Sequence, residues 1–174
     1  TAQLRGSWHN FSKYRPLIRE LVTRDLKVKY RRSFLGYVWS ILNPLLMMLL
    51  QTLVFSYMFR FQIENFPLYL ICGNTLFNFF NESTNMGMGS VLGNSSLIKK
   101  VYVPKFIFPI SRVVSSFVNL LFSLAAIILV MLITRSPFHL TILLVWAPLV
   151  LLFLFTCGIA LLLSALAVYF RDLQ

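Results

Sequence analysis

The fold is decided by an uncharged stretch at residues 36–59, which reads GYVWSILNPLLMMLLQTLVFSYMF. These 24 residues would form a helix about 36 Å long at about 1.5 Å per residue, and the hydrocarbon core of a bilayer is about 30 Å thick. Trp39 stands near one end of the stretch and Tyr57 near the other, as aromatic residues do at the two membrane interfaces. The stretch therefore predicts a transmembrane helix.

Three further apolar runs follow along the chain, at residues 66–92, 106–133 and 140–170. The composition agrees with them, since 58% of the 174 residues are hydrophobic, 12% are charged and the mean hydropathy is +0.77. An ordinary soluble domain is about half apolar and about a quarter charged. We therefore expect an all-α, polytopic transmembrane helical bundle with four spans. The same figures exclude a disordered chain, a disulfide scaffold and an ordinary cytosolic enzyme.

The basic residues predict how this bundle is oriented. Residues 1–35 hold nine Lys or Arg and residues 93–112 hold four, and one more follows the last span at Arg171. The opposite side holds two, Arg60 and Arg135. By the positive-inside rule, both termini are expected in the cytoplasm. The formal charge of +11 is expected to meet anionic lipid rather than nucleic acid, because no zinc-ligand spacing or RNA-binding aromatic motif is present.

Residues 1–35 are expected to form a cytoplasmic element ahead of the membrane domain at residues 36–170. Apolar residues recur at helical spacing between Tyr14 and Arg32, with basic residues between them. These apolar residues are Leu17, Ile18, Leu21, Val22 and Leu26. The pattern predicts an amphipathic helix on the cytoplasmic face of the membrane, where a net charge of +7 would be attracted to anionic headgroups. A solvated basic tail is the alternative.

The second span carries polar residues at three- and four-residue intervals, which places them on one helix face. Polar groups that face lipid are costly, so this face either lines a path for a polar substrate or forms hydrogen bonds with another helix. Glu82 is the one acidic residue deep in an apolar run. The third span has a similar face, whose serines fit close helix packing. The candidate substrate path consists of Asn74, Asn78, Asn81, Glu82, Asn85 and Asn119.

The chain carries no signature of catalysis. It has no Gly-rich phosphate loop ending in Lys-Ser or Lys-Thr, no His-Glu-x-x-His and no Gly-x-Ser-x-Gly. His9 and His139 lie at opposite ends of the predicted topology, and Cys72 and Cys157 fit small buried hydrophobic residues inside apolar runs. We therefore expect no enzymatic activity, no metal site and no cofactor on this chain.

The predicted cytoplasmic loop at residues 93–105 reads GNSSLIKKVYVPK. Asn94 or Ser95 can cap a short helix here, and Pro104 ends it. A short amphipathic helix between two spans would form a docking element for a soluble partner. The alternative is a basic loop held at the lipid headgroups.

Three motifs, in this order, resemble the membrane subunits of type 2 ABC transporters that export polysaccharides. Residues 24–33 read RDLKVKYRRS and lie ahead of Asn43-Pro44, like the start of the first span in that family. Residues 97–105, together with Phe108-Pro109, resemble the family's coupling region. Residues 169–172 read YFRD and resemble the turn after the fourth span.

The resemblance implies the permease of a half-transporter. Two copies would pair with two ABC ATPase subunits, which would hold ATP and Mg²⁺, in a bacterial plasma or inner membrane. The exported molecule would be O-antigen, capsule or teichoic acid carried on a lipid diphosphate. The residues implied in coupling to the ATPase are Leu97, Ile98, Lys99, Lys100, Val101, Tyr102, Arg171 and Asp172. The residues expected to attract lipid headgroups or the diphosphate, from their charge and position, are Arg31, Arg32 and Arg112.

Family members usually have six spans, so we expect a truncated permease with residues 171–174 beginning a second cytoplasmic turn. Other functions stay open. One is a type 2 ABC permease for a drug or a simpler lipid, although the basic motif at residues 24–33 favours polymer export. Another is a membrane enzyme acting on lipid-linked sugars, which would need a cluster of catalytic groups that Glu82 alone does not supply. The polar stripe disfavours a simple membrane anchor.

Overall fold

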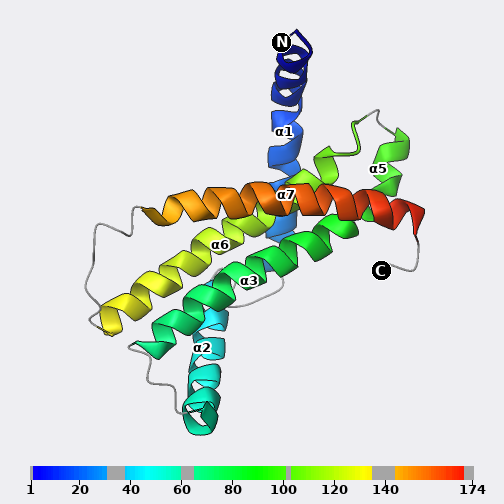
Figure 1. The fold of residues 1–174 in the computed structure, drawn as a ribbon. Coiled ribbons are helices and arrows are strands. Elements are labelled where there is room, and N and C mark those ends of the chain that lie inside the picture. The colour runs from blue at the N-terminus through cyan, green and yellow to red at the C-terminus, as the bar shows by residue number, and fades with distance from the viewer. Residues whose placement is uncertain (1, 31–37, 60–64, 101–102, 135–143, 171–174) are drawn as a thin grey trace. The chain divides into compact units, whose positions relative to one another are not determined.

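The computed structural model describes residues 2–30, 38–59, 65–100, 103–134 and 144–170. The regular structure of these residues is entirely helical (Figure 1), which confirms the all-α prediction. The helices in chain order are α1 (Ala2–Tyr30), α2 (Val38–Phe59), α3 (Phe66–Met88), α4 (Ser90–Gly93), α5 (Ser95–Lys100), α6 (Ile107–Ile133) and α7 (Trp146–Tyr169).

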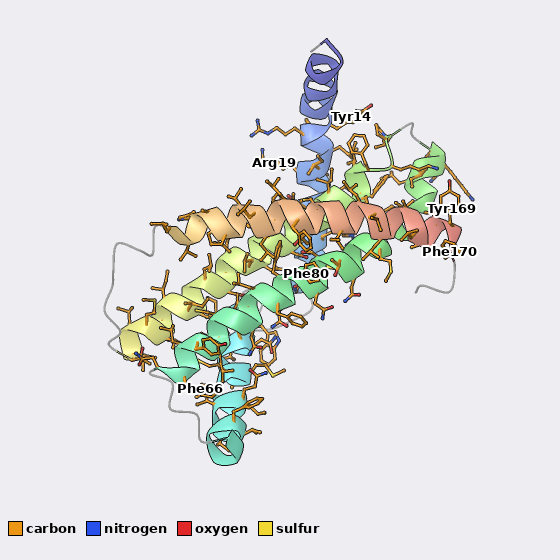
Figure 2. The ribbon with its side chains drawn as sticks, in the orientation of Figure 1. Tyr14, Arg19, Phe66, Phe80, Tyr169 and Phe170 are labelled. Atoms are coloured by element: carbon orange, nitrogen blue, oxygen red, sulfur yellow. The ribbon has the colours of Figure 1, made fainter. Side chains whose placement is uncertain are left out.

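Among the described residues, α6 and α7 are the helices that are long and apolar enough to cross a membrane by themselves, with 27 and 24 residues. Their apolar segments are only 28% and 22% buried. Leu151, Leu154 and Phe155 of α7 are more than half exposed, and at its end Tyr169 and Phe170 are exposed as well (Figure 2). The core helix of a soluble protein would be mostly covered. These surfaces therefore fit lipid rather than water.

The first two apolar runs form helices whose apolar parts are shorter. In α2 the apolar part is Ile41–Phe55, and α3 contains the polar stripe. The run predicted at residues 66–92 is interrupted, because α3 ends at Met88 and α4 follows a turn at Gly89. Glycine is about 1 kcal/mol less favourable than alanine in a helix, which explains a break at this glycine. That α2 and α3 span the membrane stays a prediction.

The chain divides into two compact units, and the division falls within α3, α6 and α7. The first unit comprises Thr1–Lys29, Ser83–Ser115 and Leu154–Gln174, and the second comprises Tyr30–Glu82 and Ser116–Phe153. Each unit has its own hydrophobic core. The buried core residues of the first unit are Ile18, Leu21, Ile107 and Phe108. Those of the second unit are Met48, Ile71, Ala126 and Val130.

The core of the second unit also includes a row of aromatic rings. Phe117 of α6 meets Phe79 of α3 edge-on, with ring centroids 5.8 Å apart, and meets Phe153 of α7 at 5.0 Å. Edge-to-face pairs at such distances add to the stability that burial provides. Phe79 is 3% exposed, so this ring belongs to the core of the bundle.

The N-terminal segment forms α1, which extends beyond the predicted 14–32 helix toward the N-terminus. Ile18 and Leu21 are buried against α6, whereas Arg19 of the same helix is exposed (Figure 2). Part of the apolar face of α1 is therefore covered by the protein itself. Contact between α1 and the membrane surface stays a prediction.

In the first unit, α3 and α7 approach each other closely at Gly87. A Cβ atom added to Gly87 would lie 2.8 Å from Cβ of Ala160 and 3.4 Å from its Cα. Alanine has no flexible side chain that could move aside, so one of the two helices would have to shift. The contact therefore requires glycine at position 87.

We predict that Gly87→Ala destabilises the protein by about 1–3 kcal/mol, the usual cost of overpacking. Gly158→Ala on α7 is the matched control, because a Cβ atom there would meet nothing within 4 Å. The measurement is the midpoint of thermal unfolding in detergent, followed by size-exclusion chromatography. The double change Gly87→Ala with Ala160→Gly should recover stability. Equal midpoints for Gly87→Ala and Gly158→Ala would contradict the close contact.

Candidate functional site

A buried carboxylate joins three segments of the first unit. Asp25 of α1 is 9% exposed, and its Oδ1 lies 3.2 Å from Nη2 of Arg24 and 3.1 Å from Nη1 of Arg112 on α6. Arg24 also donates from Nη2 to Oδ1 of Asn94 at 3.1 Å, and Asn94 donates from Nδ2 to the carbonyl oxygen of Ser90 at 2.8 Å. We call Arg24, Asp25, Asn94 and Arg112 the Asp25 cluster. It connects α1, the junction of α4 with α5, and α6.

The Asp25 cluster is asymmetric in its exposure and in its bonding. The side chains of Arg24 and Arg112 are 44% and 23% exposed, so water still solvates them, whereas that of Asp25 is 5% exposed. Both guanidinium groups bind Oδ1, and Oδ2 is buried with no hydrogen-bond partner among the described residues. A buried carboxylate is costly unless it is paired, so Asp25 depends on these two arginines more than they depend on it.

Asp25 is not among the residues predicted to form a site, although its spacing contains a signal. Ile18, Leu21 and Asp25 are separated by three and four residues, so they share one face of α1. Glu20, the other acidic residue of this segment, lies off that face and is exposed. An acidic residue on the apolar face of a basic helix indicates a buried ion pair. The spacing does not identify the basic residue that pairs with it.

The predicted short helix in the loop at residues 93–105 is present as α5. Its Leu97 and Ile98 pack against the core of the first unit, whereas Lys99 and Lys100 are exposed. The backbone N–H groups of Leu97 and Ile98 donate to the carbonyl oxygen of Asn94 at 3.0 and 3.1 Å. Asn94 therefore starts α5 with its backbone and binds Arg24 with its side chain. The apolar half of α5 anchors it, and its lysines face outward.

The remaining predicted residues of this region are placed only in part. The guanidinium group of Arg112, predicted to attract a diphosphate, is paired with Asp25. Its role toward lipid stays a prediction. Six predicted residues lie outside the described part of the chain: Arg31, Arg32, Val101, Tyr102, Arg171 and Asp172.

In the second unit, part of the polar stripe binds neighbouring helices. Asn74 of α3 donates from Nδ2 to Oε1 of Gln51 on α2. Asn119 of α6, which is 8% exposed, donates from Nδ2 to Oε1 of Glu82 on α3 at 3.1 Å. These bonds join helices in the way that the packing interpretation of the stripe predicts. Gln51 is a participant that the site prediction missed, although a glutamine within an apolar run was a signal for it.

The other part of the stripe is exposed. The side chains of Asn78, Asn81 and Asn85 lie on the exposed face of α3. Asparagine is poorly suited to contact with lipid, so this face needs a polar environment or a second protein surface. Asn74, Glu82 and Asn119 thus form contacts between helices, and whether the exposed asparagines line a path stays a prediction.

The helical fold, the lipid-compatible surfaces of α6 and α7 and the paired polar residues within the helices define a polytopic helical membrane protein. The sequence pattern of the ABC-2 type transporter family matches residues 16–174. The chain belongs to this family.

Several relatives agree with this assignment. The chain is 36% identical over 165 residues to an O-antigen export system permease protein of Myxococcus xanthus, covering 92% of this chain and 62% of that protein. It is 32% identical over 161 residues to the protein of the same description from Klebsiella pneumoniae, covering 91% and 61%. A polysialic acid transport protein of Escherichia coli is 27% identical over 167 residues, covering 90% and 62%. The chain spans about three-fifths of the length of these relatives.

We predict that Asn119→Ala destabilises the protein by about 1 kcal/mol, because it removes a hydrogen bond between α3 and α6. Asn78→Ala is the matched control, since it makes the same change at an exposed position of α3 and should stay within about 0.5 kcal/mol of the original stability. Unfolding by a denaturing detergent, followed by circular dichroism, measures both variants. Equal destabilisation by the two changes would contradict the division of the stripe.

Proposed function

We propose that the chain is part of a permease subunit of an ATP-driven exporter that moves a lipid-linked polysaccharide across a bacterial inner membrane. The structure of α5 carries the proposal. Leu97 and Ile98 fix this helix to the core formed by α1 and α6, and Lys99 and Lys100 point outward. A soluble partner that binds the lysines could therefore displace α5 and, through the core, the start of α6.

The partner that suits this arrangement is an ABC ATPase. The chain has no phosphate-binding loop of its own, so ATP and Mg²⁺ would be held by the partner. Closure of two ATPase subunits on ATP would push on α5, and a change of helix positions would alternate access to the two sides of the membrane. Two copies of the permease would bind two ATPase subunits. The proposed coupling residues in the described part of the chain are Leu97, Ile98, Lys99 and Lys100.

The substrate class follows from the relatives and from the exposed face of α3. The relatives are described as exporting O-antigen in two species and polysialic acid in a third, and these are different glycans. A path that serves such polymers must offer hydrogen bonds without demanding one sugar. The side chain of Asn78 is exposed on α3 and offers both donors and an acceptor. We propose that this face contacts the glycan. A drug or a simpler lipid is the less supported cargo.

We predict that the double change Lys99→Glu and Lys100→Glu lowers recovery of the ATPase about tenfold when the permease is purified from its host membrane, because it reverses the charge of the docking surface. Lys27→Glu, at an exposed position of α1, is the control and should leave recovery unchanged. Quantitative mass spectrometry of the purified complex gives the ratio. Absence of any ATPase with the original permease, or undiminished recovery with the double variant, would contradict the docking role.

The proposed contact between α3 and the glycan can be tested at Asn78. Asn78→Leu should lower the amount of surface polysaccharide by about tenfold, because it removes two donors and an acceptor from the proposed contact face. Phe77→Leu, at the neighbouring exposed position, is the control and should leave export unchanged. Surface polysaccharide is measured on intact cells, and the amount of permease in the membrane is measured alongside. Normal export by Asn78→Leu would remove this face from the path.

A further inference from the structure

The Asp25 cluster joins the start of α5 and the start of α6 to α1. Asn94 lies immediately before α5, and Arg112 lies in the second turn of α6. Both contact the adjacent pair Arg24 and Asp25 on α1, with atom separations of 3.1 Å. The start of α5 and the start of α6 are therefore both attached to a single turn of α1.

Apolar contacts alone do not specify the register of α5 and α6 on α1. Ile18 and Leu21 of α1 pack against Ile107 and Phe108 of α6, and Leu97 and Ile98 of α5 pack on the same core. Burial of this kind is non-directional, so it holds the helices together without specifying which groups pair. Charge-assisted hydrogen bonds have defined distances and directions, and they fix the register of the helices they join.

We propose that Asp25 is a positioning residue that keeps α5 and the start of α6 in register on α1, so that a displacement of α5 also moves the start of α6. The proposal rests on the proposed function, since the displacement comes from a partner that binds α5. Asp25 touches neither the substrate nor ATP in this scheme. It acts through Arg24 and Arg112.

The second carboxylate oxygen of Asp25 suits such a role. Both guanidinium groups bind Oδ1, and Oδ2 is buried without a hydrogen-bond partner in the part of the chain that the structure describes. With no partner on Oδ2 among the described residues, the carboxylate is held through Oδ1 by the two arginines, and its loss would release both of them together.

The test compares Asp25→Asn with Glu20→Gln in the full-length permease, co-expressed with its ATPase in the host. Both changes replace an acid by its amide on α1, but Glu20 is exposed. We expect Asp25→Asn to lower surface polysaccharide about tenfold while ATPase recovery and ATP hydrolysis by the purified complex stay within about twofold of the original. Glu20→Gln should change none of these quantities.

Two further variants separate positioning from folding. Asp25→Asn together with Arg112→Gln removes the ion pair and one of the two neighbouring guanidinium charges, and it should return the thermal midpoint toward the original value without restoring export. Asp25→Glu keeps the charge and should restore part of the export. Recovery of export together with thermal stability in the double variant would show a structural role only and would overturn the proposal.

The outcomes also distinguish this proposal from the proposed function. An original permease that retains its ATPase and exports polysaccharide, combined with normal export by Asp25→Asn, would overturn the positioning role alone. An original permease that neither retains an ATPase nor exports polysaccharide would overturn the proposed function, and the positioning role with it. Loss of export with hydrolysis intact in Asp25→Asn, but not in Glu20→Gln, would support the proposal.

Discussion

Burying a charged or amide group is costly unless it is paired, and this cost shapes the polar contacts between helices within each unit. Asp25 is buried on the apolar face of α1 and is paired with Arg24 and Arg112. Asn119 is buried on α6 and binds Glu82 of α3. Apolar burial supplies most of the cohesion but no direction, since one apolar side chain can replace another at a similar contact. The few polar contacts therefore select the register in which the helices pack.

The sequence predicts the helices well because helix formation leaves a periodic pattern in one dimension. The apolar runs, the amphipathic face of α1 and the short helix within residues 93–105 could all be read from spacing. The pattern shows which residues share a face, but it contains no information about what that face meets. The bonds from Arg24 to Asn94 and from Asn119 to Glu82 join residues far apart in the chain, so the pairing appears only in three dimensions.

The same limit applies to the end of the second apolar run, where α3 ends at Met88 and α4 follows. Glycines at positions 87, 89 and 93 could be read as tolerated within a helix, because the surrounding residues continue the apolar pattern. The structure shows different environments for them. Gly87 is in close contact with Ala160, Gly89 lies in the turn that ends α3, and Gly93 has open space beside it. One residue type thus serves packing in one place and termination in another, and only the neighbours distinguish these roles.

The size of α5 connects the packing to the proposed mechanism. A helix of six residues is far below the length of about 12–15 residues at which isolated helices become even marginally stable. Its existence depends on the core that receives Leu97 and Ile98 and on the carbonyl oxygen of Asn94, which accepts their backbone N–H groups. A helix stabilised mainly by its surroundings cannot be displaced without disturbing them. A partner that displaces α5 through Lys99 and Lys100 would therefore also move α1 and α6. A longer helix, stable by itself, could detach from the core and move alone.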